Sequence, residues 1–235
     1  MRRWTVKSWA GGLVALAGAA LGAGAVLLWD GGGHGAADGD GVRRYLLAHP
    51  EVIPEAMQRL RDRETGTLIA AGRRAIETPV GSAWAGNPRG DVTLVEYYDY
   101  NCGFCRSSLP TIAALVKADP GVRVVYRELP VLAQSSHAAA LASLAAARQG
   151  RFAAFHDALY AAGPVSDATI AAVARQAGVT VAPSPADEAE IAANLKTAGR
   201  LGIGGTPGWI VGDRMLIGAQ TLDGLRDAIA AARGR

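Results

Sequence analysis

The stretch VEYYDYNCGFCRSSL, residues 95–109, decides how this chain folds, because it holds the chain's two cysteines, Cys102 and Cys105. The residues before them, VTLVEYY at 92–98, form a nearly continuous apolar run that predicts a buried strand. The residues after them, 106–117, predict a helix. A strand that leads into C-x-x-C at a helix start indicates redox chemistry, because the unpaired N–H groups and the positive end of the helix dipole favour the thiolate of Cys102.

Cys105 follows Cys102 by about one helical turn, which places the two sulfurs near enough to close a disulfide. We therefore expect Cys102 to be the exposed nucleophile and Cys105 the enclosed, resolving thiol of a redox-active pair. A structural disulfide is disfavoured, because a loop this short removes little entropy from the unfolded chain. A zinc site is disfavoured too, and no metal or cofactor is predicted, because the histidines form no second ligand pair: His34, His49, His137 and His156.

The 235 residues are half apolar, enough for one substantial domain and an appendage. The net charge of +3 comes from Arg2, Arg3 and Lys7. Without these three, 21 basic residues remain against 21 acidic ones, so the body of the protein is neutral. A neutral body argues against nucleic acid as a partner.

The N-terminal charges precede an unbroken apolar stretch at residues 10–29, which predicts a cleaved export signal or a membrane anchor within residues 1–29. Both interpretations stay open, because the length suits a bilayer span while AGA at 23–25 and GAA at 35–37 offer small-residue cleavage sites. Residues 30–41 form a Gly-rich linker. The positive charges at the N-terminus are expected to stay on the cytoplasmic side of the membrane. The remaining chain then faces the periplasm or cell envelope, which is an oxidising compartment.

Residues 42–60 carry apolar positions at helical spacing, with a break near His49-Pro50. They predict a helical arm over 42–78 that either folds back onto the main domain or pairs with other copies of the chain. Residues 79–235 then contain strand, helix and turn signals that complete one domain. Strands are predicted at 122–128, 208–211 and 214–217, helices at 136–147, 152–161, 167–177, 187–200 and 221–232, with Thr221 as the last N-cap.

Strand–helix–strand and strand–strand–helix units thus flank a helical segment at about 133–200. The predicted fold class is α/β, a thioredoxin fold with an inserted helical subdomain and an N-terminal helical arm. Within this fold Glu96 is a lone carboxylate in an apolar strand, six residues before Cys102. If side chains alternate between the core and solvent along this strand, Glu96 faces solvent. If the strand is buried on both faces, a carboxylate there needs a function, and accepting a proton from Cys105 supplies one.

The remaining candidate site residues are expected to lie around the cysteines and to contact the cysteine-containing proteins on which this site acts. Gly103 and Phe104 separate the two cysteines, and Phe104 supplies no basic nitrogen that would make the couple strongly oxidising. Thr206-Pro207 directly precedes the strand at 208–211, where proline can be a mere strand-entry residue. If the bond is cis, the Thr206 backbone is aimed at a substrate beside Cys102.

These residues together resemble the DsbA-like branch of the thioredoxin superfamily. The resemblance is carried by VTLVEYYDYNCGFC (92–105), VVYRELPVL (124–132), FAAFHDALY (152–160) and GGTPGWIVGDRMLIGAQTLDGLRDAI (204–229). It implies a C-x-x-C active site at Cys102 and Cys105, a buried acid at Glu96 and a cis-proline at Pro207. The Gly-Phe dipeptide departs from the Pro-His of the strong oxidases. The arm at 42–60 is similar to the extension of suppressor-of-copper-sensitivity C proteins, some of which oligomerise through it and act as disulfide isomerases.

The expected activity is that of an exported thiol–disulfide oxidoreductase that forms or rearranges disulfides in cysteine-containing client proteins, with an unidentified redox partner that recycles the site. One alternative is an oligomeric disulfide isomerase. An alternative of another class is a thiol-based copper-binding or chaperone module.

Overall fold

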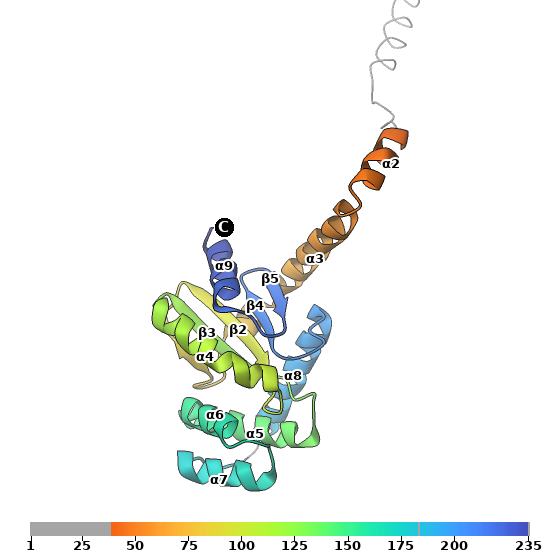
Figure 1. Cartoon of the computed structure of the whole chain (residues 1–235). Coiled ribbons are helices and arrows are strands. Elements are labelled where there is room, and N and C mark those ends of the chain that lie inside the picture. Colours follow the sequence, from red (N-terminus) through yellow and green to blue (C-terminus); the bar gives the residue numbers. More distant parts are fainter. Residues whose placement is uncertain (1–38, 183, 235) are drawn as a thin grey trace, which may run out of the picture. The chain divides into compact units, whose positions relative to one another are not determined.

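The computed structural model describes residues 39–182 and 184–234, drawn in colour in Figure 1. The predicted signal or anchor segment at 10–29 and most of the linker lie outside the described residues. The chain divides into two compact units, residues 1–57 and 58–235.

The described part of the first unit consists of α2 (Gly39–Ala48) and the start of α3 (Val52–Glu77), and the predicted break falls between them. Several apolar side chains of this part are exposed: Val42, Tyr45, Leu47, Ile53 and Met57. Over residues 39–182 and 184–234, none of the helices combines the length and apolar character that crossing a membrane requires.

The second unit is built on a five-stranded sheet in the order β1-β3-β2-β4-β5. The central strand β2 (Val92–Tyr98) runs parallel to β3 (Val122–Glu128) and antiparallel to β4 (Gly208–Val211). The edge strands are β1 (Trp84–Gly86) and β5 (Arg214–Ile217), both antiparallel to their neighbours. Because β2 has a strand on each side and helices on both faces, all of its residues are buried.

Two groups of helices cover this sheet (Figure 1). One face packs against α4 (Gly103–Ala118), α6 (Phe152–Ala161) and α9 (Leu222–Arg233), through a core that includes Leu94, Leu115 and Phe155. The other face packs against the later part of α3 and the end of α8 (Pro185–Leu201), through Val95 and Ile69 among others. The helical insertion is completed by α5 (Gln134–Arg148) and α7 (Asp167–Ala177).

The predicted thioredoxin fold with a helical insertion and an N-terminal helical arm is confirmed. Strands β2 to β5 and helices α6 and α7 have the predicted bounds, and the Thr221 hydroxyl caps α9 by accepting a hydrogen bond from the Gly224 N–H at 3.0 Å. Helices α5, α8 and α9 differ from the predicted bounds by one or two residues at each end, and two differences are larger. Helix α4 begins at Gly103 instead of residue 106, because the Cys102 sulfur caps it. Strand β1 was not predicted, since three residues are too few to show alternation.

Candidate redox site

Cys102 is the N-cap residue of α4, with extended backbone angles of φ −83° and ψ 114°. Its sulfur accepts a hydrogen bond from the main-chain N–H of Cys105 at 3.4 Å, and its carbonyl accepts one from the Arg106 N–H at 3.1 Å. The sulfur therefore lies against the first turn of the helix, where backbone donors are otherwise unpaired. This is the environment that stabilises a thiolate.

The two cysteines are free thiols of unequal accessibility. Cys102 is 6% exposed and Cys105 1% exposed. The expectation that Cys102 is exposed needs correction, because this residue is itself nearly buried. The cause is the segment before β4: the Cys102 thiol donates a hydrogen bond to the Thr206 carbonyl at 3.2 Å, so Thr206 covers part of the sulfur.

Thr206 and Pro207 reach this position through the sheet. Strand β4 pairs antiparallel with β2, with Gly208 opposite Tyr97, so the residues before Gly208 meet the loop that follows β2. The Thr206-Pro207 peptide bond is cis, as expected. The Thr206 hydroxyl is buried and has no hydrogen-bond partner in the described part of the chain.

Glu96 is buried beneath the cysteines, which excludes the interpretation that alternation turns it to solvent. On one side it is paired with Tyr126 of β3, and on the other with Trp209 of β4. Burial raises the pKa of Glu96 well above its usual range, and the charge of Cys102 raises it further. Burial also raises the pKa of the Cys105 thiol, and the Glu96 charge adds to that effect. A carboxyl and a thiol that both resist ionisation are suited to sharing one proton.

The dipeptide between the cysteines faces outward. Phe104 is 66% exposed, and a Cβ at Gly103 would meet no atom within 4 Å. Phe104 thus presents a large apolar surface directly beside Cys102.

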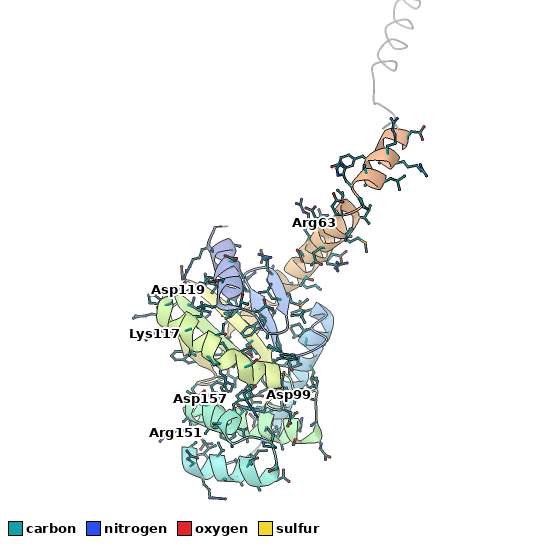
Figure 2. All side chains as sticks on the ribbon, viewed as in Figure 1. Arg63, Asp99, Lys117, Asp119, Arg151 and Asp157 are labelled. Atoms are coloured by element: carbon teal, nitrogen blue, oxygen red, sulfur yellow. The ribbon has the colours of Figure 1, made fainter. Side chains whose placement is uncertain are left out.

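Asp99 was missed by the sequence reasoning. It lies where the sheet meets the helical insertion (Figure 2), is 1% exposed, and hydrogen-bonds the loop at 99–102, the loop after β3 and the first turn of α5. Its carbonyl accepts hydrogen bonds from the Cys102 N–H and the Tyr160 hydroxyl, each at 3.0 Å. The sequence did contain a signal for this residue: Asp99 is an acid that directly follows the predicted strand at 92–98 and precedes Cys102 by three residues.

A second buried polar cluster lies between the sheet and the insertion: Tyr98, Tyr100, Glu128, Ser143 and His156. Burial raises the pKa of Glu128 to about 8, although hydrogen bonds from Ser143 and Tyr98 lower it. Burial lowers the pKa of His156 to about 3, so this histidine is neutral. The other helical histidine, His137, is exposed beside Glu188.

No group of three or more His, Cys, Asp or Glu side chains suited to a metal ion occurs over residues 39–182 and 184–234. Cavities of about 520 and 570 Å³ lie beside α3 and β5, away from the cysteines.

Comparison with protein families gives two matches. Residues 93–230 match the DSBA-like thioredoxin domain. Residues 39–65 match the copper resistance protein ScsC N-terminal domain, so the second match begins with α2.

Solved structures similar in fold include the following three. A thioredoxin-like oxidoreductase from Silicibacter pomeroyi DSS-3 is 40% identical, with a TM-score of 0.62 over 65% of this chain and 92% of that one. The catalytic domain of Proteus mirabilis ScsC is 25% identical, with a TM-score of 0.68 over 72% and 99%. A periplasmic thioredoxin-like protein from Salmonella enterica serovar Typhimurium is 29% identical, with a TM-score of 0.65 over 69% and 96%.

Curated relatives are much longer proteins. The Na(+)/H(+) antiporter NhaA 3 of Salinispora tropica is 42% identical over 72 residues, which cover 30% of this chain and 11% of the antiporter. The antiporter NhaA 1 of Salinispora arenicola is 29% identical over 150 residues, 60% of this chain and 23% of that protein. The chain therefore spans less than a quarter of the curated relatives it matches.

Proposed function

Because this chain belongs to the DsbA-like thioredoxin family, we propose that it is a thiol–disulfide oxidoreductase that exchanges disulfides with cysteine-containing proteins of the cell envelope. The observation that carries the proposal is the position of the Cys102 sulfur. It lies at the N-cap of α4, accepts the Cys105 N–H and contacts the Thr206 carbonyl. A sulfur so placed can ionise, attack a disulfide and then be attacked by its neighbour.

The exchange proceeds in two steps. In the reducing direction the Cys102 thiolate attacks one sulfur of a client disulfide, which forms a mixed disulfide and releases the other client sulfur as a thiolate. Cys105 then loses its proton and attacks the Cys102 sulfur, which releases the second client thiolate and leaves Cys102 and Cys105 joined. The client gains two electrons and the protein loses two. We assign the acceptance of the Cys105 proton to the buried Glu96 carboxylate.

Clients are expected to bind as extended segments against the site. The Thr206 backbone precedes a strand and lies at the Cys102 sulfur, so it is placed to pair with a client chain in strand fashion. Exposed Phe104 gives such a segment an apolar contact.

The direct test is exchange with a protein disulfide. We expect the full chain to reduce insulin in the presence of glutathione, Cys102→Ser to abolish the reaction, and Cys105→Ser to accumulate mixed disulfides with insulin. His137→Gln is a suitable control, because that side chain is exposed on α5. A chain that is inert towards insulin, yet binds copper through Cys102 and Cys105, would replace the enzyme with the copper-binding alternative.

The isomerase alternative is favoured by one further observation. The segment that matches the ScsC N-terminal domain exposes apolar side chains on both of its helices, including Tyr45 and Ile53. Such a surface suits pairing between copies of the chain, and an oligomer would bring several redox sites to one misfolded client. Reactivation of scrambled ribonuclease tests this activity. If ribonuclease activity recovers no faster with the protein than with glutathione alone, the isomerase alternative is excluded and the protein is an oxidoreductase without isomerase activity.

A location in the cell envelope fits the same chemistry. The Salmonella relative is described as periplasmic, and the predicted N-terminal signal or anchor at residues 10–29 points the same way. An oxidoreductase there needs a redox partner that returns the cysteines to their working state. Fractionation of cells that express the full chain checks the location.

A further inference from the structure

A cavity of about 180 Å³ lies on the face of the sheet that packs against α4 and α6, and the proposed exchange does not use it. Its walls come from both helices and from strands β1 and β3. Most of the lining side chains are apolar, among them Ile112 and Val116, and three are the aromatic rings of Trp84, Tyr126 and Phe152. A dry apolar cavity of about 150 Å³ holds one benzene ring, so this cavity can hold a single ring with a small substituent.

The His156 side chain lines the same cavity, and only one of its two ring nitrogens has a partner. The residue is 2% exposed. Its Nδ1 lies 3.1 Å from the Tyr100 hydroxyl oxygen, whereas Nε2 is buried and has no hydrogen-bond partner among residues 39–182 and 184–234. A buried polar atom without a partner is unfavourable, so Nε2 indicates a group that enters the cavity and bonds it.

The hydrogen bonds around Tyr100 determine which nitrogen of His156 carries the proton. A tyrosine hydroxyl has one hydrogen, and that of Tyr100 donates to the Ser143 oxygen at 2.9 Å. The Tyr100 oxygen therefore accepts a hydrogen bond from Nδ1–H of His156. Because this histidine is neutral, its Nε2 carries a lone pair and is an acceptor. The group that completes the cavity is thus a hydrogen-bond donor.

From the size of the cavity, its aromatic walls and its unpartnered acceptor, we infer that the protein binds a small phenol here, with the phenol hydroxyl donating to Nε2 of His156. Aromatic walls favour an aromatic ring over an aliphatic chain of the same size. Water is a poorer occupant, because a buried water molecule makes about three hydrogen bonds and most of this wall is apolar. The inference does not depend on the proposed function.

Asp157 limits the class of ligand further. It follows His156 on α6, lines the cavity and is exposed, so its carboxylate lies at the rim (Figure 2). A negative charge there repels an anionic ring. Benzoate is excluded on both counts, because its carboxylate is negative and has no hydrogen to donate to Nε2. A neutral phenol meets both conditions.

Titration of the full chain with phenol, toluene and benzoate, followed by the ligand NMR signals, tests the inference. Toluene has the shape of phenol but no hydroxyl, and His156→Phe retains an aromatic ring but no nitrogen. We expect phenol to bind and benzoate not to bind. The ratio of phenol affinity to toluene affinity should fall about tenfold in His156→Phe, the effect of one hydrogen bond to a buried acceptor. An unchanged ratio would overturn the inference, as would a wild-type chain that binds no phenol.

A second pair of variants locates the ligand without altering His156. Ala113 lines the cavity from an exposed position on α4, so Ala113→Leu places a larger side chain in the opening. Ala114→Leu is the matched control, because it adds the same side chain at the next exposed position, which does not line the cavity. Ala113→Leu should weaken phenol binding about tenfold or more, while Ala114→Leu should bind phenol as wild type does.

Equal phenol affinities in Ala113→Leu and Ala114→Leu would place the ligand elsewhere and overturn the inference. If His156→Phe does not fold, this alanine pair decides alone. N-acetyltyrosinamide provides the last comparison, because it carries the same phenol ring on a peptide-like group. If it binds more tightly than phenol, the cavity receives a tyrosine side chain of another protein, and the assignment to a small molecule fails.

Discussion

Glu96 and Glu128 are both buried on the face of the sheet that packs against α4 and α6, in neighbouring strands, yet their surroundings differ. Glu128 accepts a hydrogen bond from the Tyr98 hydroxyl within the aromatic cluster. The Glu96 side chain makes no hydrogen bond among residues 39–182 and 184–234, and the charge interaction that acts on it is with Cys102. A buried acid without a fixed partner is free to receive a proton, which is the basis of the first prediction.

Glu96→Gln should lower the rate of insulin reduction about tenfold or more, because a general base contributes at least that much to proton transfer. The free energy of unfolding at neutral pH should rise, since the raised pKa obliges Glu96 to take up a proton on folding, whereas the amide is neutral in both states. Turnover and urea unfolding of the two proteins measure both effects. A rate unchanged across the pH range would remove Glu96 from the mechanism.

Glu128 predicts a pH dependence of stability. Its pKa of about 8 means that the folded protein keeps a proton which the unfolded chain releases near pH 4.5, so the free energy of unfolding falls as pH rises towards 8. The lowered pKa of His156 acts with the opposite sign, and only below about pH 6.5. Between pH 6.5 and 8 the contribution of Glu128 to the unfolding free energy can therefore be measured without that of His156.

Glu128→Gln should remove roughly 2 kcal/mol from the fall in unfolding free energy over that interval. Urea unfolding at the two pH values gives the difference, with Glu64→Gln on the exposed side of α3 as control. Wild type and Glu128→Gln showing the same fall would mean that the carboxyl ionises normally in the folded protein.

Helix α3 is attached to the sheet through Arg127 of β3. This buried guanidinium donates to main-chain carbonyls at the end of α3, including that of Ile76 at 3.1 Å, and to Glu190 of α8 at 2.6 Å. Removing one partner of a buried ion pair leaves the other without compensation. It also leaves the last carbonyls of α3 without donors.

Arg127→Met should therefore lower the free energy of unfolding by about 3 kcal/mol, with Arg226→Met as an exposed control that changes little. Urea unfolding of the full chain measures both. A loss below about 1 kcal/mol would show that apolar packing alone attaches α3.

The sequence predicted best those elements whose pattern is local. The strand at 92–98 is apolar throughout, and the helices at 152–161 and 167–177 have clear start and stop signals, so their bounds agree with the structure. The cysteines, Glu96 and Pro207 were found because each stands out from its neighbours. Asp99 was not, because its importance comes from donors in a loop more than 30 residues away, which no local pattern reveals.

For the whole molecule, the exposed apolar side chains of the arm predict self-association. Ile53 and Met57 lie one turn apart on the same face of α3, and both are about half exposed. We expect sedimentation of the full chain to show an oligomer, and Ile53→Asp with Met57→Asp to give a monomer that still reduces insulin. Gln58→Asp adds charge about 100° around the helix from Met57 and should leave the assembly intact. A monomeric wild type would remove the basis of the isomerase alternative.

The contact between Cys102 and Thr206 joins residues 104 positions apart, and that separation has a consequence in time. A ribosome adding about 5–20 residues per second needs roughly 5–20 s to make the intervening chain. Throughout that interval β2 lacks its β4 neighbour, and the nucleophilic sulfur lacks the carbonyl that covers it. Each new molecule thus completes its two thiols before the carbonyl that covers Cys102, which arrives with the final hairpin. A chain stalled before residue 206 should therefore expose the Cys102 sulfur more than the complete chain does.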